Sequence, residues 1–267
     1  MIPRDKSPTF RAGLNPAFNK PTMFQNIGEM VILFWRTLLS LPLTWRHRKK
    51  LFEQLFEIGN ASLLMVCVLS FFIGAVIALQ TGPLLVRQGL ASYVGGMVGY
   101  SIARELAPVM MGVLLAGRIG SAMTAEIGSM RVYQEIDALR TMNINPVHYL
   151  VLPRMLAAAI AMPMLVTFAI LVGWLGGATV AATNHEMKIA FKVFFQDLRA
   201  YVDLADVLHG VVKSFFFAII IGLVSCHQGL VTRGGPRGIG RSVTKSVVNS
   251  IVLIIVFDYL LTRVLQK

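Results

Sequence analysis

Long stretches without a charged residue constrain the fold of this chain more than any other feature of its sequence. No charge occurs between Glu57 and Arg87, and Ala61–Leu79 alone is long enough to cross the hydrocarbon core of a bilayer. Four further apolar stretches follow, at about 93–115, within 154–186, from Lys213 to about 232, and at 243–264. Because about 20 apolar residues in a helix span a bilayer, the sequence predicts an all-α polytopic membrane protein with five transmembrane helices.

Composition and charge exclude several other classes of protein. Hydrophobic residues make up 55% of the chain and charged residues only 14%, whereas about a quarter of the residues in a soluble domain are charged. Five spans and their connections use almost all of the 267 residues, so no room remains for a soluble catalytic domain. The densest basic run, within 46–50, directly precedes the first span. There it would face anionic lipid, so we expect membrane lipid and not nucleic acid as its partner.

The first 56 residues are expected to lie outside the spans. Residues 1–22 are polar and contain four prolines, which is typical of a flexible cytoplasmic tail. Residues 23–43 place apolar side chains at helical spacing, which predicts an amphipathic helix in the membrane interface, with Trp35 and Trp45 at headgroup depth. A sixth span is the alternative. We therefore divide the chain into a tail (1–22), an interfacial helix and elbow (23–56) and a transmembrane domain (57–267).

Lysine and arginine predict the orientation of the spans, because loops rich in these residues stay in the cytoplasm. Sixteen of them lie in the N-terminal segment and in the loops at 118–150 and 231–245, against six on the opposite side. The N-terminus is therefore expected in the cytoplasm and the C-terminus on the other side of the membrane. Residues 186–206, on that outer side, have the pattern of an amphipathic extramembrane helix.

Small residues one helical turn apart predict where the spans pack closely. Gly95 and Gly99 form one such pair, and Gly173 and Gly177 form another. Glycine at this spacing lets two helix backbones approach each other in lipid. Glycine is also simply frequent in transmembrane helices, so the pattern alone is weak.

Ionisable residues inside the predicted spans are the first candidates for function, because burying a charge in a membrane is costly. Arg104 and Glu105 interrupt the second span, Lys213 opens the fourth, preceded by Asp206, and Asp258 lies inside the fifth. If the helices form a bundle, these charges can converge on a water-filled cavity suited to an amphiphile with a charged headgroup. The alternative is a structural ion-pair network that fixes the register of the helices.

The sequence offers no recognisable cofactor or metal site. The five histidines are scattered, without a pair at i and i+4, and no nucleophile motif is present. Residues 235–242 resemble the phosphate loop of ATPases, but Arg241 stands where that loop needs a lysine and no strand precedes it. We therefore expect no cofactor, no metal and no catalytic chemistry in this chain.

The connection between the second and third spans carries a second group of candidates. A short amphipathic helix is predicted at about 126–142, ending before Pro146. A helix in this place suits either the docking of a separate motor subunit or an ordinary surface loop. The residues that we assign to docking and coupling are Glu126, Ile127, Gly128, Met130, Arg131, Glu135 and Asp137.

Several separated motifs resemble the MlaE-type (YrbE-type) permease family of MCE-associated ABC transporters. They cover the chain from about residue 60 to its C-terminus, and they occur in the same order as in that family. They are Arg104-Glu105-Leu106-Ala107-Pro108, Ala116-Gly117-Arg118-Ile119-Gly120, Glu126-Ile127-Gly128-Ser129-Met130-Arg131, Ile136-Asp137-Ala138-Leu139, Asn145-Pro146, Pro153-Arg154, Asp206 with Lys213-Ser214, and Phe257-Asp258-Tyr259-Leu260-Leu261-Thr262.

The resemblance implies a homodimeric permease in the bacterial inner membrane that moves phospholipids or related lipids between the inner and outer membranes. It implies a cytoplasmic ABC ATPase that binds the 126–142 helix and hydrolyses ATP, an MCE-domain lipid-binding protein, and in some systems a small regulatory subunit. It also implies that Arg104, Glu105, Asp206, Lys213 and Asp258 lie near the lipid path. The sequence Tyr-Gln-Glu at 133–135 departs from the pattern of the family, because its acidic residue is displaced by one position. The resemblance therefore does not define which ion pairs this segment forms with the ATPase. A carrier driven by an ion gradient, with Glu105 and Asp258 carrying protons, is the alternative function.

Overall fold

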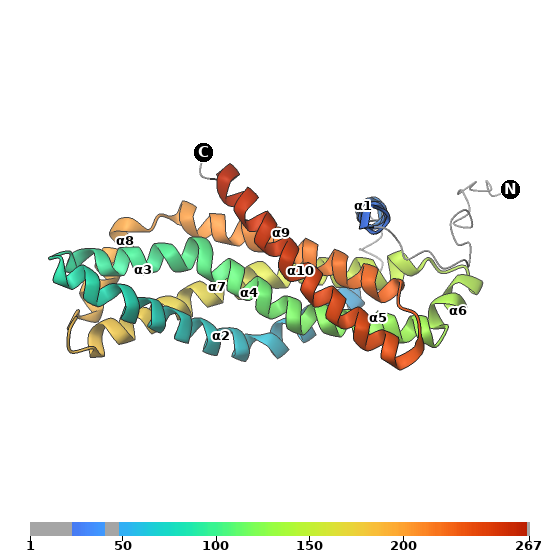
Figure 1. The fold of residues 1–267 in the computed structure, drawn as a ribbon, viewed down its shortest axis with the longest axis horizontal. Helices are drawn as coiled ribbons and strands as arrows, with labels where there is room; N and C mark the ends of the chain where they lie inside the picture. Colours follow the sequence, from blue (N-terminus) through green and yellow to red (C-terminus); the bar gives the residue numbers. More distant parts are fainter. Residues whose placement is uncertain (1–22, 41–47, 266–267) are drawn as a thin grey trace.

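Most of the long helices lie side by side along the long axis of the molecule, and the last one before the C-terminus crosses them obliquely (Figure 1). The computed structural model describes residues 23–40 and 48–265, and within these ranges it contains helices and no strand. Five of the described helical segments are long and apolar enough to cross a membrane: Lys49–Arg87, Ala91–Val132, Val147–Thr183, Leu204–Leu230 and Gly235–Leu265. The prediction of an all-α chain with five transmembrane helices is therefore confirmed.

The spans are built from a longer series of helical segments, some of them joined end to end. The first span is α2 (Arg48–Arg87), the third is α7 (Leu152–Thr183), the fourth is α9 (Leu204–Leu230) and the fifth is α10 (Gly235–Leu265). The second span is a continuous rod made of η2 (Ala91–Tyr93), α3 (Val94–Ser101), η3 (Ile102–Leu106), α4 (Ala107–Leu115), η4 (Ala116–Gly120) and α5 (Ser121–Val132). The remaining segments are α1 (Met23–Leu39), α6 (Glu135–Thr141), η5 (Val147–Val151) and α8 (Phe191–Tyr201).

Most helices extend beyond the apolar stretches that predicted them. At about 1.5 Å per residue, the 40 residues of α2 reach about 60 Å, roughly twice the thickness of a hydrocarbon core. Lys213 therefore lies well inside α9 and does not open it, and most of the expected 231–245 loop is the first part of α10. An apolar stretch marks the thickness of the lipid, whereas a helix once formed continues through polar residues.

The predicted helix at 126–142 is wrong as a single element. Its first part belongs to α5, the end of the second span, and its second part is the separate helix α6. The break falls at Gln134, whose φ of 62° is left-handed and interrupts the helix. In Figure 1, α6 lies at one end of the bundle and α8, the extramembrane helix predicted within 186–206, lies at the other.

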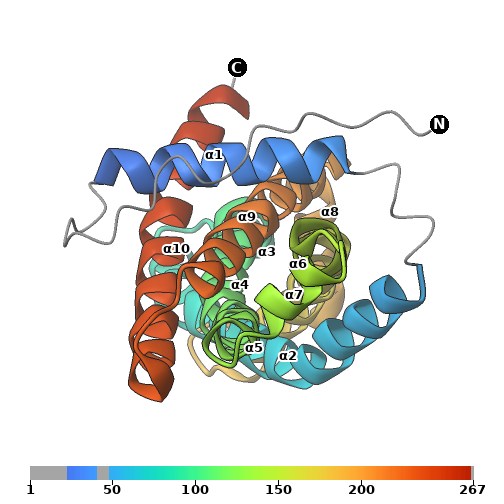
Figure 2. The same ribbon diagram turned by 90° about the vertical axis from the view of Figure 1, so that its right-hand side faces the viewer.

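Helix α1 lies across the bundle and not along it (Figure 2). It contacts α9 and η5, with Leu33 and Thr37 buried and Trp35 exposed. Glu29 on α1 lies 3.1 Å from His227 Nε2 on α9, which fixes this helix to the bundle. The predicted tail at 1–22 and the residues 41–47, including Trp45, lie outside the described residues. The crosswise direction favours the interfacial interpretation of α1 over a sixth span.

Glycines set the closest helix contacts. A Cβ atom at Gly74 on α2 would overlap the carbonyl oxygen of Gly173 on α7, and one at Gly176 would overlap the carbonyl oxygen of Phe71. On the second span, a Cβ atom at Gly95 would overlap the backbone of Phe194 in α8. Both predicted glycine pairs therefore lie at helix–helix contacts, where the missing side chain lets the backbones meet.

Candidate functional site

A wide turn in the second span positions Arg104 and Glu105. Residues Ile102–Leu106 form a π-helical turn, a feature that often occurs at functional sites. Pro108, which lacks an N–H group, follows directly in α4 and leaves the carbonyl oxygen of Arg104 without its usual helical donor. The ammonium of Lys213 takes that place, with Nζ 3.2 Å from the Arg104 oxygen. The Arg-Glu-Leu-Ala-Pro motif thus creates an acceptor that a lysine from another span satisfies.

Lys213 is the centre of a polar cluster inside the apolar bundle, and its side chain is only 1% exposed. Its Nζ donates to Glu105 Oε2 at 2.6 Å and to Thr262 Oγ1 at 2.7 Å, in addition to the Arg104 carbonyl. These three acceptors use all the donors of an ammonium group. Asp258 Oδ1 lies 3.1 Å from Nζ, so this contact is an ion pair without a fourth hydrogen bond. The cluster joins the second, fourth and fifth spans.

Arg104 makes a second, linked ion pair at the start of the fourth span. Its Nη1 lies 3.2 Å from Asp206 Oδ1, and the same guanidinium donates to the Tyr100 hydroxyl one turn earlier. The other oxygen of Asp206 accepts a hydrogen bond from the backbone N–H of Asp203, the N-cap of α9. Asp206 therefore caps its own helix and binds the neighbouring span at the same time.

The structure brings together all five charged residues that the sequence placed on the substrate path: Arg104, Glu105, Asp206, Lys213 and Asp258. Two further members, Thr262 and Tyr100, were not assigned from the sequence. Each lies four residues from a charged member of the cluster in its own helix and therefore on the same helix face. This spacing could have identified both residues as members of the cluster. The Glu105 side chain is 37% exposed and that of Asp258 is 21% exposed, so the carboxylates open the cluster to its surroundings.

The charges of this cluster do not balance. Two cations, Arg104 and Lys213, face three carboxylates. The cluster therefore carries one carboxylate more than its cations can pair.

At the opposite end of the second span, the residues predicted to couple to an ATPase divide into two groups. Ile127 is fully buried and packs against Gly229 of α9, and Gly128 is buried beside Thr232. Packed in this way, neither residue presents a surface to another subunit. Their effect is to fix α5 on α9, and their assignment to ATPase coupling stays a prediction.

The exposed members of this group lie around the break between α5 and α6. Arg131 Nη1 lies 2.8 Å from Asp137 Oδ1, and Arg140 Nη1 lies 3.3 Å from the same oxygen, so Asp137 ties α6 to α5. Met130 is half-buried, whereas Glu135 and Tyr133 are exposed. This exposed surface, at the end of a span that also carries the polar cluster, is able to receive a partner.

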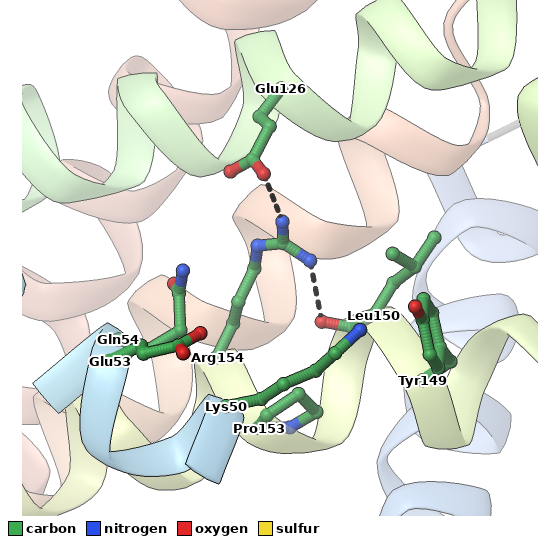
Figure 3. Close-up of a pocket in the computed structure, with 8 residues that line it drawn as sticks. All are labelled: Lys50, Glu53, Gln54, Glu126, Tyr149, Leu150, Pro153 and Arg154. Carbon is green, nitrogen blue, oxygen red and sulfur yellow. Dashed lines mark hydrogen bonds and ion pairs between the residues drawn. The ribbon is translucent and has the colours of Figure 1, made fainter. Parts of the chain in front are cut away.

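Glu126 forms an ion pair with Arg154 at the start of α7 (Figure 3). Arg154 is buried and also donates from Nη1 to the Leu150 carbonyl oxygen at 2.9 Å. The sequence marked Arg154 as part of a Pro-Arg motif and assigned it no role. The sequence carried no clear signal of this pairing, because basic residues are common at the edge of an uncharged stretch.

Comparison with known proteins gives a consistent result. A family model described as Permease MlaE matches residues 51–264. A probable ABC transporter permease protein of Rickettsia typhi is 35% identical over 91% of this chain and 93% of its own length. A probable ABC transporter permease protein of Synechocystis is 34% identical over 90% of each chain. Protein TRIGALACTOSYLDIACYLGLYCEROL 1 of Arabidopsis thaliana, a chloroplast protein, is 32% identical over 81% of this chain and 61% of its own length.

Proposed function

The chain belongs to the MlaE permease family, and we propose that it is the transmembrane subunit of an ABC transporter that moves phospholipids or related lipids between the inner and outer membranes. ATP is hydrolysed by a partner subunit, and this chain supplies the path across the membrane. The Arabidopsis relative, whose name refers to a diacylglycerol lipid, supports a lipid substrate.

The observation that carries this proposal is the polar cluster around Lys213. It is held by three spans within an otherwise apolar bundle, and its carboxylates are partly exposed. A lipid needs such a combination, because its headgroup requires polar partners while its tails require apolar walls. Exposed apolar side chains on α10 near the cluster, such as Ile255 one turn before Asp258, provide such walls.

The exposed surface at the end of the second span is proposed as the docking site of the ATPase. Helix α6 lies at the end of the bundle (Figure 1), and Tyr133, just before it, is exposed. Helix α5 continues from there, without a gap, into the rod that carries Arg104 and Glu105. A push on α6 is therefore transmitted along one helix to the polar cluster. This arrangement couples ATP hydrolysis to a change in the lipid site.

We further propose that two copies of the chain form the complete path, in a bacterial inner membrane with the N-terminus in the cytoplasm. The apolar part of α10 is mostly unburied within one chain, and a second copy is suited to cover it. An MCE-domain protein would receive the lipid on the outer side, where α8 lies, and a small regulatory subunit would complete the complex.

The test is purification of the tagged protein from its native membrane in mild detergent, followed by reconstitution into vesicles with a fluorescent phospholipid. We expect an ABC ATPase and an MCE-domain protein to copurify, and lipid transfer to require ATP. Purification without any ATPase, together with lipid transfer that proceeds unchanged when ATP is withheld, would overturn the proposal.

The unequal charges of the cluster favour one second candidate, a carrier driven by a proton gradient. In that function the excess carboxylate among Glu105, Asp206 and Asp258 binds and releases the proton. The two functions differ in their energy source: a proton ionophore stops the gradient-driven carrier, whereas an ATPase inhibitor stops the ABC transporter.

A further inference from the structure

A second polar site lies at the α6 end of the bundle, apart from the Lys213 cluster. A cavity of about 180 Å³ is lined by residues of α2, α5, η5 and α7: Lys50, Glu53, Gln54, Glu126, Tyr149, Leu150, Pro153 and Arg154 (Figure 3). Nothing in the transport path described above uses this cavity.

The Arg154 guanidinium, which lines this cavity, has one donor without an acceptor among the described residues. Nη2 binds Glu126 and Nη1 binds the Leu150 carbonyl oxygen. Within the described part of the chain, no group accepts a hydrogen bond from Nε, although the side chain is only 7% exposed. A buried donor without an acceptor is costly, so a ligand with an acceptor oxygen at this position is favoured.

The other charges of the cavity define the ligand more closely. Lys50 adds a second cation, with Nζ 3.2 Å from the centre of the Tyr149 ring. Glu53 adds a carboxylate on α2, one turn from Lys50. With Glu126 bound to Arg154, the four charges sum to zero. A ligand that carries both an anionic and a cationic group therefore fits better than a simple anion.

The position of the cavity along the spans indicates a lipid ligand. Arg154 directly precedes an uncharged stretch that continues to His185, and Glu57 is the last charge of α2 before Arg87, so the cavity lies where the apolar parts of two spans begin. Phe52 and Phe56, on the same turns of α2 as the cavity, are 66% and 71% exposed. Such exposed rings belong in the acyl region next to the headgroups.

We propose that this cavity binds the headgroup of a zwitterionic phospholipid, with its phosphate at the two cations Lys50 and Arg154 and its amine at Glu53. The bound headgroup connects α2 to the Glu126–Arg154 pair and so to α5, the element that leads to the docking surface. The inference rests on the proposed function in taking this end of the bundle as a membrane face, but its test requires no transport.

The test measures how lipid protects a cysteine in the cavity. Gln54→Cys, in a Cys67→Ser background, is purified with any copurifying subunits in a maltoside detergent and labelled with a water-soluble maleimide. The added probes are phosphatidylethanolamine, phosphatidylglycerol, diacylglycerol with the same acyl chains, and glycerophosphoethanolamine. We expect phosphatidylethanolamine to slow labelling about tenfold, and diacylglycerol to have no effect.

Charge variants identify the groups that recognise the headgroup. Lys50→Gln should abolish protection, while Lys49→Gln, the same change of charge on an exposed neighbouring residue, should retain it. Glu53→Gln should shift the preference toward phosphatidylglycerol, because the carboxylate that binds the amine is gone. Neither Lys50 nor Glu53 is buried, so these variants are expected to fold.

Three outcomes would overturn the inference while leaving ATP-driven transport intact. Equal protection by diacylglycerol would mean that acyl chains alone occupy the cavity. Equal protection by glycerophosphoethanolamine would assign the cavity to a soluble phosphate compound and not to a lipid. Equal loss of protection in the Lys49 and Lys50 variants would show that surface charge, and not the cavity, attracts the lipid.

Discussion

Lys213 is the residue on which the polar cluster depends. Replacing it by methionine keeps the length of the side chain but leaves Glu105 and Asp258 without their cation. Breaking a buried ion pair in this way costs about 3–5 kcal/mol. We therefore expect Lys213→Met to lower the thermal unfolding midpoint by several degrees and to reduce lipid transfer at least about tenfold.

A double variant separates the structural role of Lys213 from its role in transport. Lys213→Met combined with Asp258→Asn removes one cation and one carboxylate, so most of the lost stability should return. If Lys213 serves the lipid path, transport stays low in the double variant, as measured by transfer of fluorescent phospholipid. Recovery of both stability and transport would show that the cluster only holds the helices together.

Asp197 on α8 is a second residue whose environment has a measurable consequence. Burial raises the pKa of this carboxyl above its ordinary value of 3.8, and its Oδ2 atom is buried with no hydrogen-bond partner in the described structure. The folded state therefore binds the proton more tightly than the unfolded state, and Asp197 lowers stability as the pH rises above about 4.

Asp197→Asn should remove this dependence on pH. We expect the variant to match the wild-type protein near pH 4 and to become increasingly more stable than it toward pH 7. Hydrogen exchange of the α8 amides at several pH values is the appropriate measurement, because the effect is local to the contact of α8 with α3. Parallel curves for the two proteins would contradict the assignment.

The sequence identified the charged members of the cluster but not their partners. Arg104, Glu105, Lys213 and Asp258 were predictable, because a charge within an apolar stretch stands out whatever its neighbours are. Arg154 was not, because it lies at the edge of such a stretch, where basic residues are common. Its pairing with Glu126 depends on how α5 packs against α7, which a local pattern does not encode.

At the level of elements, the number of spans was predictable, but the division of the 126–142 segment was not. Its apolar spacing continues across Gln134, so periodicity alone indicates one helix. The left-handed backbone at Gln134 lets the chain turn so that Ile136 is buried in a cluster that includes Leu150 and Val151. Burial of this kind overrides the local pattern.

This division changes what is expected of two charge reversals near the docking surface. Glu135 is exposed on α6, so Glu135→Lys should weaken association with the ATPase without affecting the stability of the chain. Glu126 pairs with buried Arg154, so Glu126→Lys should lower stability as well, by about 2 kcal/mol or more. Copurification of the ATPase and thermal unfolding measure the two effects. Unchanged ATPase recovery with Glu135→Lys would exclude the exposed start of α6 from the interface.

The contact between α2 and α7 allows a direct test of how closely these elements pack. Gly176→Leu places a side chain where the Phe71 backbone lies and should cost about 3 kcal/mol or more. Gly59→Ala, also in a helix but with nothing within 4 Å of its Cβ position, should be neutral or stabilising by up to about 1 kcal/mol. The yield of monodisperse protein in detergent distinguishes them, and equal yields would mean that the two helices can separate without loss of the fold.

At the scale of the whole molecule, the segments that the basic residues assign to opposite sides of the membrane lie at opposite ends of the bundle (Figure 1). Helix α6 and the start of α2, with Lys49 and Lys50, lie toward one end of the bundle, while α8, with Lys192 and Arg199, lies at the other. The sequence alone predicted which loops lie on the same side of the membrane, because two loops separated by an even number of spans are on the same side. It did not predict that α5 extends the second span as one rod to the docking surface.

The proposed orientation determines which end is accessible from outside an intact cell, and this is open to direct measurement. Lys192→Cys on α8 and Glu135→Cys on α6 are both exposed positions at opposite ends of the bundle. In spheroplasts, a membrane-impermeant maleimide should label Lys192→Cys at once and Glu135→Cys only after lysis, with Cys67→Ser as the common background. The reverse pattern would place α6 outside the cytoplasm, where no ATP is available to an ATPase bound there, and would refute the coupling mechanism along the second span.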